Sequence, residues 1–208
     1  MIPLFVDCSG KRIVIFGGGE VASRKAAYFS GEADVLVVSR SFSHKISTLP
    51  VERRIMDTGM VSDEVLREMT DGAFLVIGAF SDRVQNNRIK DICLMKGILF
   101  NNADGEAGDV VIPSVTGGEN YTLAISTKGN SPAVSRFIRE YLETQLPSLD
   151  EMVALQRDLR TQLKQSEPSV SRRNVILREV LNDPTLWETL SRDPARARQY
   201  VKEKYLHE

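Results

Sequence analysis

The sequence predicts an α/β protein: an N-terminal Rossmann-type doubly wound parallel sheet, then a small β-hairpin and helix region, then a C-terminal all-helical region. Three observations predict this order. Short apolar runs alternate with helix-like stretches up to about residue 112, a glycine-rich turn follows the first run, and charged helical segments follow residue 147. We therefore expect three domains, at residues 1–112, 113–147 and 148–208.

The first element pair has a βαβ outline. An apolar run at 13–16 passes through three glycines into a helix-like stretch, and a second apolar run follows at 35–38. Gly17 permits the tight turn, Gly19 lets the backbone approach a pyrophosphate, and Ala22 keeps the helix close to the sheet. The helix N-terminus then offers free N–H groups to phosphate. The plainer alternative is an ordinary tight turn before a core helix.

The remaining elements of the first domain follow in alternation. Their patterns predict a helix at 41–49, a strand at 51–56, a helix at 61–69, a strand at 74–77, a helix at 83–95 and a strand at 98–100. In a doubly wound sheet, ligands bind at the carboxyl ends of the strands. We therefore expect Gly17, Phe80 and Asn101 to face one crevice.

The pattern changes at Pro113. Two strands are predicted around a Gly-Gly-Glu-Asn turn, and a helix then opens with Ser131 as its cap and Pro132 at its first position. The hairpin and the amphipathic helix are too small to bury their own apolar face, so we expect a dimerisation region and a homodimer. Beyond it, breaks at Pro168, Pro184 and Pro194 predict about three short helices.

Composition excludes several classes of function. The chain has 208 residues, a formal net charge of -1 and 42% hydrophobic residues, so we expect no nucleic acid partner. No apolar run reaches the ~18 residues of a spanning helix and no signal peptide is evident, so we expect no membrane and a cytoplasmic protein. Cys8 and Cys93 are predicted to be free thiols, and His44 and His207 to be surface residues, with no protein metal site.

Four motifs resemble, in the same order, the precorrin-2 dehydrogenase / sirohydrochlorin ferrochelatase family, the siroheme synthase module. They are "VIFGGGEVASRKAAYF", "FNNADGE", "VIPSV" and "LAISTKGNSPAVSRFIREYLE", and the similarity spans about residues 1–148. The resemblance implies NAD-dependent oxidation of precorrin-2 to sirohydrochlorin. In bifunctional members it also implies insertion of Fe²⁺, as a substrate, to give siroheme. It further implies a Rossmann domain, a dimerisation region and a helical region.

The resemblance places the catalytic chemistry at Asp104, the aspartate of the family's Asn-x-x-Asp string. A carboxylate past a strand end could take a proton while hydride leaves for the nicotinamide. A turn-forming aspartate in a glycine-rich loop is the alternative. The loop after Asp104 departs from many members, because Glu106 stands where a proline is usual and the loop is a residue shorter. This departure weakens the expectation of metal insertion more than that of dehydrogenation.

The cofactor residues come from the glycine motif, from the strand ends and from the Asn-x-Arg string that the resemblance matches at Asn86. They are Gly17, Gly18, Gly19, Glu20, Val21, Ala22, Ser39, Arg40, Ala79, Phe80 and Asn86. Arg40 after the second strand is the usual NADP arrangement, whereas the family works with NAD. We expect NAD rather than NADP. Phe80 replaces a commoner threonine, so its cofactor contacts are expected through the backbone.

The substrate residues are expected at Asn102 and in the Ser-Thr-Lys-Gly-Asn-Ser-Pro string. Ser126, Thr127 and Lys128, with Arg136, would meet the carboxylates of a tetrapyrrole. A purely structural loop with Ser131 as helix cap is the alternative, and both roles can hold together. Two rival functions stay open: a chelatase for iron or cobalt only, and a non-catalytic scaffold that senses NAD or handles tetrapyrroles.

Overall fold

The structure is a computed structural model that describes residues 2–103 and 108–206. The chain divides into two compact units, residues 1–112 and 113–208. Each unit is described by itself. A further division of the second unit between residues 147 and 148 stays a prediction.

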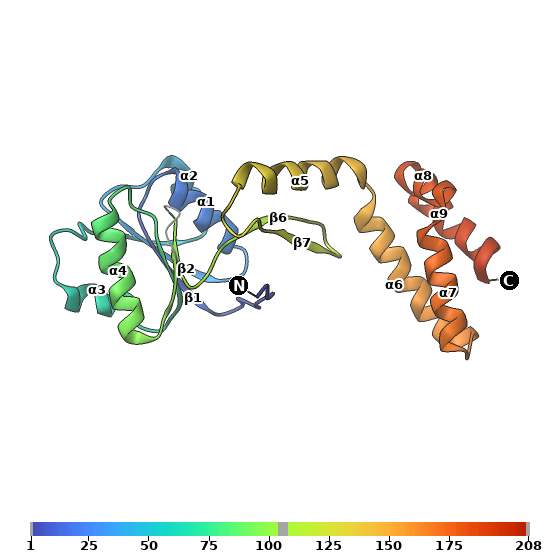
Figure 1. Cartoon of the computed structure of the whole chain (residues 1–208), viewed down its shortest axis with the longest axis horizontal. Coiled ribbons are helices and arrows are strands. Elements are labelled where there is room, and N and C mark those ends of the chain that lie inside the picture. Colours follow the sequence, from blue (N-terminus) through green and yellow to red (C-terminus); the bar gives the residue numbers. More distant parts are fainter. Residues whose placement is uncertain (1, 104–107, 207–208) are drawn as a thin grey trace. The chain divides into compact units, whose positions relative to one another are not determined.

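The first unit is built on a five-stranded parallel sheet, as the sequence predicts (Figure 1). Its strands are β1 (Arg12–Phe16), β2 (Asp34–Ser39), β3 (Glu52–Ile55), β4 (Ala73–Gly78) and β5 (Leu99–Asn102). Their order is β3-β2-β1-β4-β5. The order reverses between β1 and β4, and this switch point is where doubly wound sheets bind ligands.

Helices cover both faces of this sheet (Figure 1). They are α1 (Glu20–Phe29), α2 (His44–Ser47), α3 (Asp63–Met69) and α4 (Arg83–Lys96). One core cluster joins α1 and α2 to alternate strand residues such as Ile13 and Ile15, and the other joins α3 and α4 to Val14 and Phe16. Burial on both faces explains why the central strands are continuous apolar runs.

The second unit begins with the predicted hairpin and helix. Strands β6 (Ser114–Gly117) and β7 (Thr122–Ile125) pair antiparallel, and α5 spans Pro132–Gln145. The expected cap is confirmed, because Ser131 Oγ accepts from the N–H of Val134 at 3.3 Å. The apolar side chains of α5 stay largely exposed in the single chain, with Phe137 65% and Tyr141 54% exposed.

The rest of the second unit is helical, as predicted. Its elements are α6 (Leu149–Ser166), α7 (Val170–Leu181), α8 (Pro184–Arg192), α9 (Pro194–Val201) and a terminal π-helical turn, η1 (Lys202–Leu206). The expectation of about three short helices is wrong in detail, because α6 alone has 18 residues. Buried residues from Met152 to Leu163 recur at helical spacing along it, so one apolar face sustains a long helix.

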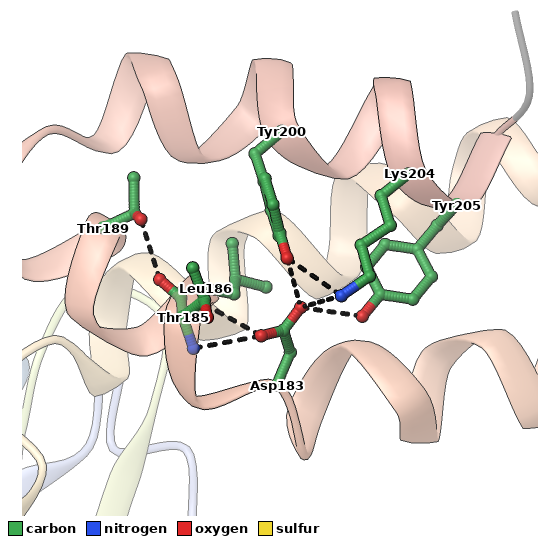
Figure 2. A network of polar contacts seen from close by, with 7 residues as sticks. All are labelled: Asp183, Thr185, Leu186, Thr189, Tyr200, Lys204 and Tyr205. Carbon is green, nitrogen blue, oxygen red and sulfur yellow. Dashed lines mark hydrogen bonds and ion pairs between the residues drawn. The ribbon is translucent and has the colours of Figure 1, made fainter.

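A buried carboxylate joins the ends of three of these elements (Figure 2). Asp183 Oδ1 accepts from the N–H groups of Thr185 and Leu186, which caps α8, and Oδ2 accepts from Tyr200, Lys204 and Tyr205 at 2.8–2.9 Å. Burial opposes ionisation of Asp183, but the hydrogen bonds from Lys204, Tyr205 and Tyr200 outweigh it and hold its pKa well below the ordinary value. Asp183 therefore ties α8, α9 and η1 together as a carboxylate.

Candidate functional site

A cavity of about 690 Å³ lies in the first unit where the strands end. It is formed by the segments after β1, β2, β3 and β4, at the switch point of the sheet, and its size suits a dinucleotide or another small ligand. Its lining residues are Gly17, Gly18, Gly19, Glu20, Val21, Ser39, Arg40, Ser41, Met56, Asp57, Thr58, Gly59, Ala79, Phe80, Ser81, Asp82, Gln85 and Ala103.

The turn from β1 to α1 has the geometry that its glycines predict. Gly17 has φ +126°, and a Cβ there would lie 2.6 Å from the carbonyl oxygen of Ala79, so only glycine fits. Gly19 differs, because a Cβ on it would meet no atom within 4 Å. The space beside Gly19 is thus open, and Gly19 lines the cavity, which leaves room for a phosphate to approach the backbone.

Helix α1 begins at this turn with an uncapped N-terminus. Gly19 is its N-cap residue and provides no side-chain hydrogen bond to the first-turn amides. Orphan N–H groups and the positive end of the helix dipole favour an anion at such a position. Ala22 is fully buried and does not line the cavity, which agrees with its expected role of packing the helix on the sheet. The local structure therefore fits a pyrophosphate.

Glu20 also lines the cavity, at the first position of α1. Its carboxylate forms an ion pair with Lys45 of α2 at 2.8 Å. Both side chains are more than half exposed, so the pair adds little stability. Its effect at the site is that the ammonium of Lys45 partly neutralises the negative charge of Glu20.

The segment after β4 is held by Asn86. Phe80 packs its ring near that of Phe16, with centroids 6.4 Å apart, while its backbone bonds the Asn86 side chain through both N–H and C=O. Asn86 is fully buried and does not line the cavity. A carbonyl oxygen accepts two hydrogen bonds, so the Phe80 carbonyl keeps a lone pair for a ligand, whereas its N–H is already used.

The end of β2 places two expected residues at the cavity. Ser39 lies beside the glycine turn, and Arg40 is 77% exposed, with Nη1 3.9 Å from Oδ2 of Asp57. Asp57 belongs to the segment from Met56 to Gly59, which the sequence analysis did not assign to the site. A usable signal existed, since a strand was expected at 51–56 and the carboxyl end of any parallel strand faces the same edge.

Arg88 of α4 holds the segment that follows β3, which forms one wall of the cavity. Its guanidinium donates to the carbonyl oxygens of Thr58 and Val61 and to the carboxylate of Asp63, each at 2.7 Å. Thr58 is buried, and Arg88 lies outside the lining. The Asn-x-Arg string therefore contributes two supporting side chains, Asn86 behind Phe80 and Arg88 behind the β3–α3 segment.

The end of β5 reaches the site only in part. Ala103 lines the cavity, whereas Asn101 is buried and donates to the carbonyl oxygen of Val110 at 2.7 Å, contrary to the expectation that it faces the crevice. Asn102, an expected substrate residue, is buried and pairs in register with Gly78. Asp104, the expected catalytic residue, lies outside the described residues.

The remaining expected substrate residues lie in the second unit. The hydroxyl of Thr127 bonds within its own loop, to the backbone of Ser131, and Ser126 Oγ accepts from the N–H of Lys128 at 3.1 Å. Arg136 pairs with Glu140 at 2.7 Å on an exposed face. Lys128 has φ +56° and is exposed, and it makes no ion pair within residues 2–103 and 108–206. These hydrogen bonds show that the loop has a structural role. Lys128 is the cation of the loop that is exposed to a ligand.

In the part of the chain that the structure describes, thiols and metal ligands do not mark a second functional site. Cys93 is buried in α4, and burial raises the pKa of its thiol to about 12, so it stays protonated and unreactive at neutral pH. His44 is exposed, as expected, and His207 lies outside the described residues. Across the described part of the chain, no group of three or more His, Cys, Asp or Glu is placed to hold a metal ion. Among the same residues, no helix has the length and apolar character needed to cross a membrane.

Comparison with known proteins gives one family model and several relatives. A family model described as NAD(P)-binding matches residues 4–114. Precorrin-2 dehydrogenase of Methanosarcina barkeri is 41% identical over 94% of this chain and 89% of its own length. Siroheme synthase of Photorhabdus laumondii is 31% identical over 87% of this chain, which spans only 38% of that protein. A solved structure titled "SirC, precorrin-2 dehydrogenase" aligns with a TM-score of 0.73 at 23% identity, covering 98% of this chain and 100% of its own, and supports the same fold.

Proposed function

Because the chain belongs to the precorrin-2 dehydrogenase family, we propose that it catalyses the NAD-dependent oxidation of precorrin-2 to sirohydrochlorin in siroheme biosynthesis. The observation that carries the proposal is the cavity at the switch point, where the glycine turn and the uncapped start of α1 fit a pyrophosphate. The M. barkeri relative supports the choice of substrate, since it is similar over nearly the whole of both chains.

NAD, when bound, supplies the hydride acceptor. The chain supplies the rest: the turn at Gly17–Gly19 receives the phosphates, and Phe80, held by Asn86, forms one wall of the cavity. Oxidation by hydride loss also releases a proton, and we propose Asp104 as the base that accepts it. In the sequence Asp104 follows Ala103, a residue of the cavity lining, which supports this assignment.

We propose that the tetrapyrrole carboxylates are bound by Lys128 and Arg136, with Asn102, Ser126 and Thr127 as polar contacts. Support comes from the exposed Lys128 and from the exposed Arg136, whose guanidinium donates to Glu140 through Nε and has further N–H groups for a substrate carboxylate. Substitution of Lys128 by Gln would then raise the KM for precorrin-2 with little change in the KM for NAD.

We propose NAD rather than NADP as the cofactor. The local signal against this choice is Arg40, which could pair with a 2′-phosphate. Support for NAD comes from the carboxylates of the cavity lining, Glu20, Asp57 and Asp82, which oppose a second phosphate. Comparison of kcat/KM with the two cofactors tests the choice, and a preference for NADP of about tenfold or more, worth about 1.4 kcal/mol, would contradict it.

We also propose a cytoplasmic homodimer that associates through residues 113–147. Support comes from the exposed apolar side chains of α5, Val134, Phe137, Ile138 and Tyr141, and from the free thiols Cys8 and Cys93, which suit a reducing compartment. Light scattering over a dilution series tests the dimer, with Phe137→Glu expected to give monomer. A monomer at every micromolar concentration of the unmodified chain would contradict it.

One assay tests the reaction and separates the rival functions. The protein is incubated with precorrin-2 and NAD, and the absorbance of NADH and of sirohydrochlorin is followed. Equal formation of both products supports the dehydrogenase, whereas a folded, NAD-binding protein that forms neither favours a scaffold. Fe²⁺ or Co²⁺ is then added as substrate to test metal insertion, the second activity that the resemblance implies.

A further inference from the structure

We infer that Asp57 determines which nicotinamide cofactor the cavity accepts, because its carboxylate faces Arg40 and opposes a 2′-phosphate. The inference rests on the proposed function in one respect: it takes the cavity as the dinucleotide site. It adds a specificity-determining residue in the segment after β3, which none of the sequence motifs marks.

The sheet brings the two residues together. Strands β2 and β3 run parallel with Ser39 opposite Ile55, and the N–H of Met56 donates to the carbonyl oxygen of Ser39 at 3.0 Å. Arg40 and Asp57 therefore leave the sheet as neighbours, and Arg40 Nη1 lies 3.9 Å from Asp57 Oδ2. Both residues line the cavity.

The exposed Asp57 carboxylate is anchored by a hydrogen bond to the backbone of its own segment. Its Oδ1 accepts from the N–H of Gly59 at 3.1 Å, so the side chain is fixed to its own turn. The turn is held in its place by Arg88, whose guanidinium bonds the carbonyl oxygens of Thr58 and Val61. Arg88 is thus a positioning residue for the wall that carries Asp57.

The charges of the lining point in the same direction. Among the described residues that line the cavity, Arg40 is the only lysine or arginine, against the carboxylates of Glu20, Asp57 and Asp82, of which Glu20 pairs with Lys45 outside the lining. A 2′-phosphate would bring two further negative charges to a site whose cation already faces a carboxylate. The 2′-hydroxyl of NAD would instead donate to a carboxylate, as it does to the acidic residue that Rossmann folds usually place after β2. Asp57 supplies that acid from the neighbouring strand.

Binding titrations with NAD and NADP test the inference on the full-length chain. Asp57→Asn keeps the size and the turn-forming amide oxygen, and removes the charge. It is expected to raise the affinity for NADP relative to NAD by about tenfold, since it frees Arg40 and removes a repulsion. The matched control is Glu52→Gln, which changes the net charge equally in the strand that precedes Asp57 but outside the cavity lining, and is expected to leave the ratio unchanged.

A second variant separates the two parts of the effect. In Asp57→Asn/Arg40→Gln the part of the NADP gain that comes from the freed guanidinium should be lost, and only the part that comes from the removed repulsion should remain. A folded Asp57→Asn with the same NAD/NADP ratio as the unmodified chain would overturn the inference. If the unmodified chain prefers NADP and Asp57→Asn still shifts the ratio tenfold, the proposed NAD preference fails and the inference stands. Binding of neither nucleotide by the unmodified chain would overturn both.

Discussion

The side-chain amide of Asn86 exchanges two hydrogen bonds with the backbone of Phe80. Its Nδ2 donates to the Phe80 carbonyl oxygen at 3.0 Å, and its Oδ1 accepts from the Phe80 N–H at 3.1 Å. The amide thus gives Phe80, just beyond the end of β4, the two hydrogen bonds that a neighbouring strand would otherwise supply. A buried residue of α4 thereby fixes a wall of the candidate cofactor cavity without touching the cavity itself.

Replacement of Asn86 by Ala should loosen that wall. The variant leaves a half-buried backbone N–H without its acceptor, at a cost of about 1–3 kcal/mol in the free energy of unfolding. NAD binding should weaken by about tenfold, because the wall is no longer preorganised. Thermal unfolding and NAD titration measure the two effects. Asn87→Ala, at the exposed neighbouring position, is the matched control, and equal behaviour of the two variants would refute the role of Asn86.

The glycine turn should separate binding from folding. Gly19→Asp places a carboxylate in open space at the start of α1, so the fold should survive while repulsion of the pyrophosphate weakens NAD binding by about 100-fold or more. Gly17→Ala should instead unfold or strongly destabilise the first unit, since its φ is +126° and the new Cβ would meet Ala79. Circular dichroism and NAD titration distinguish the two outcomes. Unchanged NAD affinity in a folded Gly19→Asp would show that the phosphates bind elsewhere.

The first βαβ unit could be predicted from the sequence because its signals are local. Glycine spacing, apolar runs and turn residues each act within a few positions of the chain, and the structure places Gly17, Gly19 and Ala22 as expected. The segment after β3, from Met56 to Gly59, carries no such motif, so its place in the cavity lining could be suspected only from the expected strand end. That strand is a charged edge strand with all four residues exposed, and its loop is held by Arg88 from 25 to 30 residues away. Such a contact exists only after the sheet has formed.

In the helical region, too, contacts between residues far apart in the sequence could not be predicted. Prolines mark two helix starts at Pro184 and Pro194, and the sequence placed both breaks correctly. The network around Asp183 was not foreseen, because Tyr200, Lys204 and Tyr205 meet it from 17 to 22 residues away. In the sequence these residues lie in a charged, helix-like stretch, and only the packing of α8, α9 and η1 gives them a buried partner.

Asp183→Asn should destabilise the helical elements in a pH-dependent way. Asn still caps α8, so the loss comes from the charge and should be about 1–3 kcal/mol at pH 7. Because the folded pKa of Asp183 is depressed, its stabilisation is present above the unfolded pKa of about 4 and is lost as pH falls below it. The difference between the two proteins should therefore shrink in acid.

The fluorescence of Trp187 measures this difference. It is the chain's one tryptophan and packs against the helical core, so its signal reports that region during urea unfolding at several pH values. Asp158→Asn, at a partly exposed position of α6, serves as the control for a change in charge. A difference between Asp183→Asn and the unmodified chain that stays constant from pH 7 to about pH 3 would contradict the linkage argument.

Asp104→Asn should keep the fold, the oligomeric state and NAD binding while removing most oxidation of precorrin-2. Asn has nearly the same shape and can still form hydrogen bonds, but it cannot accept a proton at neutral pH. If Asp104 is the general base, the rate should fall by about 10²–10⁴-fold, the usual contribution of positioned proton transfer. Single-turnover measurement of NADH formation tests this loss separately from product release. Should the variant also insert metal more slowly, one carboxylate would serve both steps. Near-normal oxidation by a folded, NAD-binding variant would leave Asp104 as a turn residue and direct the search for the base to Ser126 and Thr127.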